Sequence, residues 1–213
     1  MLQPTKMRYD KAGPKVVEKL KSRNFDAYYF STCDEAVQKV LELIPETDSV
    51  SWGGTMTVDE LGLKDMLRER GNTLIDRDTA ANMDERMELM RRSLTCDTFL
   101  MSSNAITEDG QLFNIDGNGN RVAALCFGPK SVIVVAGMNK VVADLDTAYA
   151  CVRHNTAPAV VQRFPAAKTP CNLTGECGDC TGTDSCCAYM VATRVSRPAG
   201  KIKVILIGEN LGL

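Results

Sequence analysis

The sequence contains a single histidine, His154, and this scarcity limits the catalytic chemistry that the chain can perform. A Ser–His or Cys–His hydrolase would have to rely on that one side chain, and no nucleophile-elbow motif accompanies it. A helix-end histidine held by local hydrogen bonds is the simpler interpretation. No apolar run approaches the roughly 20 residues that are needed to cross a bilayer, and the first residues lack the apolar core of a signal peptide. We therefore expect a cytoplasmic protein with no membrane partner.

Excess charge of either sign is also absent, because 25 Lys and Arg against 27 Asp and Glu leave a net charge of −2. A protein that binds phosphate backbones needs a strongly basic surface, so nucleic acid is not an expected partner. The composition, with 44% hydrophobic and 24% charged residues, is ordinary for a soluble globular chain. We expect a single domain over residues 1–213. The sequence indicates no oligomeric state.

Helical and strand patterns alternate along the chain. Strands are predicted at 27–30, 49–52, 73–75, 97–101, 132–136 and 202–207. Helices are predicted up to about residue 24, after the capping-box pairs Thr32–Glu35 and Thr57–Glu60, across 83–94 and 145–152, and as a short piece across 188–194. Repeated strand–helix alternation favours an α/β sandwich around a mostly parallel sheet. The continuous apolar runs at 132–136 and 202–207 are typical of inner strands that are buried on both faces.

A glycine-rich turn, Gly53-Gly54-Thr55, follows the predicted strand that ends at Trp52. A strand that runs through two glycines into a helix leaves free backbone N–H groups beside a helix N-terminus. Such an arrangement can form an anion-binding site. The turn matches neither the Walker loop nor the GxGxxG fingerprint, and a simple tight turn is the alternative. Glu60 could be a catalytic carboxylate, but its spacing from Thr57 favours a capping role.

Two later segments also place polar groups next to predicted strands. In the first, Asp109-Gly110 is a turn signal, and 112–115 followed by 116–120 predicts a hairpin arm with a flexible tip. Its candidate ligand contacts are Asn104, Asp116, Gly117, Gly119, Asn120 and Arg121. In the second, Lys140 comes soon after the strand 132–136, and ligands of open α/β sheets bind beyond the carboxyl ends of the strands. The alternatives are a solvated loop in which Arg121 pairs with Asp116, and an exposed lysine.

These segments, together with the Gly53-Gly54-Thr55 turn, are expected to line one cleft at the carboxyl ends of the strands. Amides, a guanidinium and an ammonium group would suit a small anion such as a nucleotide, a CoA thioester or a sugar phosphate. Spacing alone identifies no catalytic acid, base or nucleophile. The sequence therefore leaves open whether the protein is an enzyme.

Five of the nine cysteines fall between residues 171 and 187, around the CxxC pair Cys177-Gly-Asp-Cys180. Such a pair can share a metal ion or close as a disulfide. Thiols in the cytoplasm stay mostly reduced, which favours a zinc or iron–sulfur site over a structural disulfide, with a thiol–disulfide centre as a third hypothesis. The other four, Cys33, Cys96, Cys126 and Cys151, lie among apolar residues and are expected to fill the core.

Four long stretches of the sequence point to one family. They are SWGGTMTVDELGL from residue 51, the segment 104–140, the cysteine segment, and the closing GKIKVILIGENLGL. Together they resemble the LUD family, which is named for lactate utilisation proteins. The resemblance implies a three-layer α/β/α sandwich similar to ribose-5-phosphate isomerases and CoA transferases. It also implies a role in bacterial lactate or related organic-acid utilisation, where relatives act with iron–sulfur partners.

The resemblance further selects Cys171, Cys177, Cys180 and Cys187 as the cysteines of one shared centre, inserted before the last strand. Cys186 is left over, and the proline and arginine that relatives would have after Cys180 are missing. No closely repeated CxxC units of the ferredoxin kind are present. The second hypothesis for the protein is therefore an accessory or regulatory subunit whose cysteine cluster binds zinc or an iron–sulfur cluster and docks a redox protein.

Overall fold

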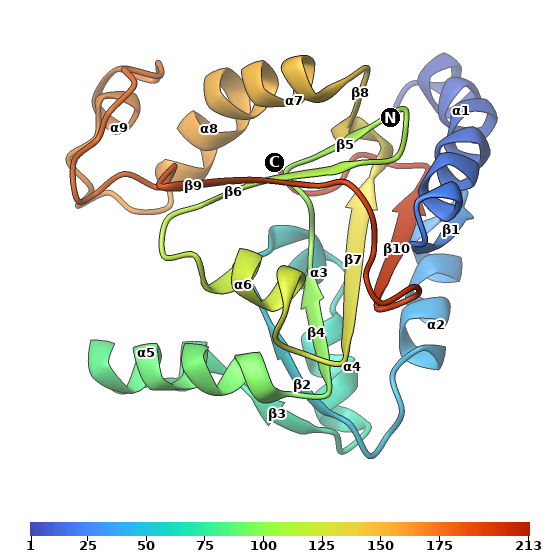
Figure 1. Cartoon of the computed structure of the whole chain (residues 1–213), viewed down its shortest axis with the longest axis horizontal. Helices are drawn as coiled ribbons and strands as arrows, with labels where there is room; N and C mark the ends of the chain where they lie inside the picture. Colours follow the sequence, from blue (N-terminus) through green and yellow to red (C-terminus); the bar gives the residue numbers. More distant parts are fainter.

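The computed structural model describes all 213 residues and contains two β-sheets (Figure 1). The central sheet has the strand order β1 (Asp26–Phe30), β10 (Ile202–Ile207), β7 (Ser131–Gly137), β4 (Thr98–Met101), β2 (Ser49–Trp52) and β3 (Thr73–Ile75). All its neighbouring strands are parallel. The prediction of a mostly parallel sheet with β7 and β10 as inner strands is thus confirmed.

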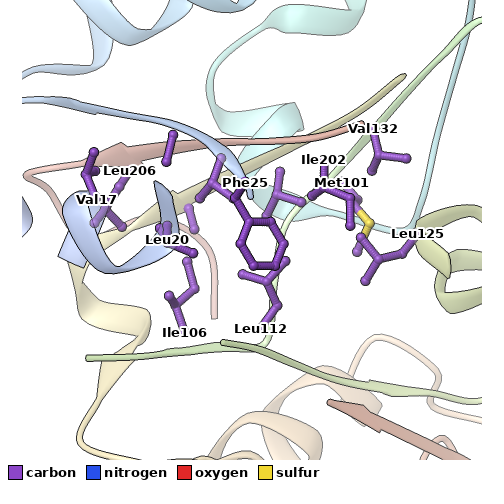
Figure 2. Close-up of a cluster of buried hydrophobic side chains, with 14 of the residues drawn as sticks. Val17, Leu20, Phe25, Met101, Ile106, Leu112, Leu125, Val132, Ile202 and Leu206 are labelled. Carbon is purple, nitrogen blue, oxygen red and sulfur yellow. The ribbon is translucent and has the colours of Figure 1, made fainter. Parts of the chain in front are cut away.

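Both faces of this sheet are covered, and its inner strands β7 and β10 carry apolar side chains toward both faces. In β7, Val132 and Val134 face one core, and Ile133 and Val135 face the other. The first core includes α1 (Gln3–Ser22), α6 (Asn120–Cys126) and part of the second sheet, and Figure 2 shows its side chains packed together. The second core is closed by α2 (Cys33–Glu42), α3 (Met56–Glu60) and α4 (Leu63–Glu69). This arrangement is the expected three-layer α/β/α sandwich.

Of the second sheet, the sequence predicted the turn at Asp109-Gly110 and the hairpin arm at 112–115, both of which the structure confirms, but not the sheet as a whole. It has the order β8 (Val141–Val142), β5 (Ala105–Thr107), β6 (Leu112–Asp116) and β9 (Tyr189–Thr193), with β6 antiparallel to both β5 and β9. In Figure 1, α7 (Leu145–Cys151), α8 (Ala157–Val161) and α9 (Pro170–Thr174) lie on the side of this sheet that faces away from β4 and β7. The helix predicted at 188–194 is wrong, because Tyr, Val and Thr suit a strand that pairs with the free edge of β6.

Two other local predictions are corrected by the structure. The helix after the Gly-Gly turn is capped by Thr55, whose Oγ1 accepts a hydrogen bond from the Val58 N–H, and not by a Thr57–Glu60 capping box. Gly62, at φ 65°, separates α3 from α4. Glu60 instead accepts a hydrogen bond of 2.8 Å from the Gly212 N–H. The Asp116–Asn120 segment connects β6 to α6 and is not the tip of a hairpin.

Two further helices form where the sequence pattern predicts them. α5 (Met83–Arg92) covers most of the helix predicted at 83–94. At the start of α2, the Thr32 hydroxyl donates to the Glu35 carboxylate at 3.2 Å and caps no backbone N–H, so the predicted Thr32–Glu35 capping box does not form. Among the scattered cysteines, Cys96 is buried as expected, whereas Cys126 is exposed and does not fill the core. None of the helices combines the length and the apolar composition that a bilayer crossing requires.

Candidate functional site

A cavity of about 400 Å³ lies where the central strands end. Its wall is built from the segments that follow the carboxyl ends of β2, β3, β4 and β7, and from the β6–α6 connection. This is the edge at which ligands of open α/β sheets bind. Nine of the ten residues that the sequence proposed as ligand contacts line this cavity: Gly53, Gly54, Thr55, Asn104, Asp116, Gly117, Asn120, Arg121 and Lys140.

Gly119 is the exception. It has φ 78° and starts α6, and a Cβ placed on it would lie 3.1 Å from Cε2 of Tyr189. It borders a separate apolar groove between α5 and α6. Gly119 therefore allows the turn into α6, where a left-handed backbone conformation favours glycine.

Lys140 is the most unusual residue of the cavity. It is only 8% exposed, and its ammonium group has no hydrogen-bond or ion-pair partner. Burial, and secondarily the charge of Arg121, lower its pKa to about 8, against a smaller opposing effect of Glu60. The closing segment of the chain lies against it, since a Cβ on Gly212 would come 3.3 Å from Lys140 Nζ and 2.7 Å from Thr57 Oγ1. A buried charge is normally paired. Because the Lys140 ammonium group has no pair within the chain, an anion from outside the chain can bind to it.

Arg77 provides a second partly unsatisfied cation. It follows β3 in a short 3-10 turn, Arg77–Thr79, and its Nε is buried without a hydrogen-bond partner. The nearest carboxylate, Asp78, is 3.9 Å from that nitrogen. Burial lowers the pKa of the guanidinium. Gly54 makes room for this group, because a Cβ at position 54 would lie 2.8 Å from Arg77 Nη2.

Arg121 lines the cavity, and its terminal nitrogens are bonded within the protein. Its Nη1 donates to the Ser102 carbonyl at 3.1 Å and to Asn114 Oδ1 at 2.6 Å. Its Nη2 donates to Asn104 Oδ1 at 2.8 Å and to the Ile115 carbonyl at 2.6 Å. The Asp116 carboxylate is 4.0 Å from Nε and accepts hydrogen bonds mainly from backbone N–H groups of α6. All four terminal protons are thus used within the protein, and Arg121 positions the cavity wall.

The charged groups around the cavity do not balance. The cations are Lys64, Arg77, Arg86, Arg121, Lys140 and Arg163, and the acidic side chains are Asp59, Asp78, Asp116 and Asp184. Lys64 pairs with Asp59 at 2.7 Å, and Arg86 pairs with Asp78 at 3.0 Å. Lys140, Arg77 and the exposed Arg163 keep unused positive charge, which favours an anion over a cation in this space.

We expect Gly53→Ala to destabilise the fold more than Gly54→Ala. A Cβ at position 53 would lie 2.8 Å from Cδ of Arg121, which four hydrogen bonds hold in place. A Cβ at position 54 meets only the far end of the Arg77 side chain, which can move. Overpacking against a fixed group costs about 1–3 kcal/mol. Chemical denaturation of the two variants measures the difference, and equal stabilities would contradict the fixed position of Arg121.

The cysteine segment forms another part of the cavity wall, through Thr183, Asp184, Ser185 and Cys186. No group of three or more His, Cys, Asp or Glu side chains is arranged in this structure as ligands of one metal ion. Cys171 is buried beside the Thr169 hydroxyl at 3.4 Å, and the Cys177 sulfur accepts a hydrogen bond of 3.2 Å from Arg153. The four cysteines that the family pattern selected do not form a ligand set here. Zinc or iron–sulfur binding and a redox-protein partner stay predictions.

Several residues of the cavity were not identified from the sequence, notably Arg77, Arg163 and Cys186. Arg77 follows a predicted strand closely, as Lys140 does, and this shared position was a usable signal. Arg163 lies after α8 and reaches the cavity only through tertiary packing. His154 does not line the cavity and lies in the helical turn Val152–Thr156, so it is not part of this site.

Comparison with known proteins supports the fold and identifies the family. A crystal structure of a DUF162 family protein from Deinococcus radiodurans superimposes with a TM-score of 0.52, covering 93% of this chain and 98% of that chain. At 10% sequence identity, this similarity shows a shared fold and nothing finer. A search of curated proteins finds no match. The LUD domain model matches residues 13–207, and the chain therefore belongs to the LUD domain family.

Proposed function

We propose that this protein binds a small anionic ligand in the cavity at the ends of β2, β3, β4 and β7, with the ammonium group of Lys140 as its main charge partner. The observation that carries the proposal is a lysine that is 8% exposed, lines a polar cavity and has no partner in the chain. An ion that loses its hydration on folding without gaining a counterion is destabilised by several kcal/mol, by order-of-magnitude estimate. A bound anion would remove most of that penalty.

The size and chemistry of the cavity restrict the ligand class. A volume of about 400 Å³ is small among ligand pockets. It suits a sugar phosphate or a carboxylic acid as a whole, or the phosphate end of a nucleotide or CoA ester. Lys140 and Arg77 supply positive charge, and the Thr57 and Ser102 hydroxyls supply neutral donors beside it. The LUD family name favours an organic acid of lactate metabolism within this class. No side chain of the cavity forms a nucleophile–base pair, so the proposal concerns binding.

The proposal makes a direct statement about pH. Because the anion binds the protonated amine, and the free Lys140 has a pKa of about 8, the affinity should change little between about pH 7, where phosphate ligands are already ionised, and that pH. Above it, deprotonation competes with binding, and the affinity should fall by up to about tenfold per pH unit. Lys140→Arg keeps its charge to a higher pH and should lose this dependence.

Isothermal titration calorimetry at pH 7, 8 and 9 with lactate, ribose 5-phosphate, AMP and acetyl-CoA tests the proposal. At least one of these anions should bind more tightly than chloride or sulfate, with proton uptake near pH 8. The function is rejected if none of the four binds, or if binding strengthens as the pH rises.

A further inference from the structure

We infer that Cys186 and Cys187 form a reversible thiol–disulfide site, open to small disulfides such as oxidised glutathione, whose closure moves one wall of the cavity. The two sulfurs lie 3.8 Å apart. They are the one pair of cysteine sulfurs in the chain that contact each other. Both side chains are partly buried, and Cys186 lines the cavity. Because Cys186 is only partly buried, a disulfide reagent can reach its Sγ from solvent without entering the cavity as a whole.

The neighbouring CxxC pair is not arranged for the same chemistry. Cys177 makes its contact with Arg153, whose Nη2 donates to its sulfur at 3.2 Å, and no contact joins Cys177 to Cys180. Cys171 lies buried against Thr169. The structure thus assigns thiol exchange to Cys186 and Cys187, and not to the CxxC motif. Cys186 is the cysteine that the family pattern does not include.

The chemistry balances as an exchange of two electrons. Cys186, which lines the cavity beside Cys187, loses its proton and attacks one sulfur of the small disulfide. That S–S bond breaks, the first small thiol leaves with a proton, and a mixed disulfide remains on Cys186. Cys187 then loses its proton and attacks Cys186 Sγ, which expels the second small thiol. Two protein thiols are oxidised to one disulfide, and one small disulfide is reduced to two thiols.

The bond between neighbours should be easily reduced again. Adjacent Cα atoms across a trans peptide are about 3.8 Å apart, whereas disulfides usually join Cα atoms roughly 4.4–6.8 Å apart. A bond formed outside that range is strained, and strained disulfides are the labile ones. The site is therefore suited to reversible modification and not to structural cross-linking.

Closure of this bond acts on the cavity through Cys186. Bonded sulfurs are about 2 Å apart, so the two sulfurs must approach each other by nearly 2 Å. Cys187 packs against the apolar cluster of Phe113, Ile115 and Ala148, so Cys186 is the freer of the two. Its backbone lies directly on the β6–α6 connection, because a Cβ on Gly117 would come 3.3 Å from Cys186 Cα. We expect a shift of the Cys186 backbone to displace that connection.

Oxidation of the full-length protein with glutathione disulfide tests the inference without any cavity ligand. Intact-protein mass spectrometry should show a loss of two hydrogens that dithiothreitol reverses, and peptide mapping should place the bond at Cys186–Cys187. The variant Cys177→Ser/Cys180→Ser should still form it, and Cys187→Ser should stop at one glutathione on Cys186. Hydrogen–deuterium exchange should change at residues 116–121 on oxidation and stay constant in β4.

Three results would overturn the inference. They are a bond mapped to Cys177–Cys180, no loss of hydrogens at concentrations that oxidise a model dithiol, and unchanged exchange at residues 116–121 in the oxidised protein. None of these outcomes bears on anion binding by Lys140, so the two proposals stand or fall separately.

Discussion

Replacing Arg121 by alanine should lower the free energy of unfolding by about 3–5 kcal/mol, since it removes a charged donor from four partly buried acceptors. The guanidinium is 12% exposed and ties together Ser102 at the end of β4, Asn104 before β5, and Asn114 and Ile115 in β6. For a domain of this length the melting temperature should fall by roughly 10 °C. Urea denaturation followed by circular dichroism measures the loss.

Arg163→Ala is the matched control for this experiment. Arg163 also lines the cavity, but its side chain is exposed and makes no hydrogen bond or ion pair in the chain. Its removal should change the stability by less than about 0.5 kcal/mol while weakening anion binding. A stable Arg121→Ala variant that simply fails to bind anions would instead make Arg121 a direct ligand contact, as its sequence position alone suggested.

Replacing Lys140 by methionine should weaken binding of the anion that titrates most tightly by about 100-fold or more, because it removes a buried charge from the pair. The stability of the ligand-free protein should stay the same or rise. Burial disfavours the charged form of this lysine, as its lowered pKa indicates, and methionine fills similar space without a charge. This combination of lost affinity with retained stability separates a ligand contact from a scaffold residue.

Lys64→Met serves as the comparison for Lys140. Lys64 lines the same cavity, but its charge is already used by Asp59 at 2.7 Å and by Asp78 at 3.5 Å. Its loss should affect affinity much less than the loss of Lys140. Equal effects of the two substitutions would mean that the cavity attracts anions only through its overall charge.

The central sheet and the place of the site could be predicted from the sequence because they depend on local patterns. The apolar runs of β7 and β10 predict buried parallel strands, and the rule that ligands bind beyond strand ends draws attention to Gly53 and Lys140. The second sheet could not be predicted in the same way. Its β5 and β8 have only three and two residues, and β9 becomes a strand because β6 offers it a free edge.

The roles of individual site residues depended on contacts between distant segments. The acceptors of Arg121 come from two stretches of chain, 102–104 and 114–115, so the residues next to Arg121 in the sequence gave no sign that its donors are occupied. The burial of Lys140 depends on Gly212 and Thr57, which lie far from it in sequence. Cys186 faces the cavity because the cysteine segment crosses the β6–α6 connection at Gly117. Such tertiary contacts leave no periodic signal in a single sequence.

A crystal structure of the protein soaked with inorganic phosphate at pH 7 tests the central claim most directly. A phosphate oxygen should lie within about 3 Å of Lys140 Nζ, inside the cavity and close to Arg77, with Arg121 still bound to its four protein acceptors. A cavity that holds only water, while Lys140 pairs with a carboxylate of the chain itself, would contradict the claim that this lysine is kept for an anionic ligand.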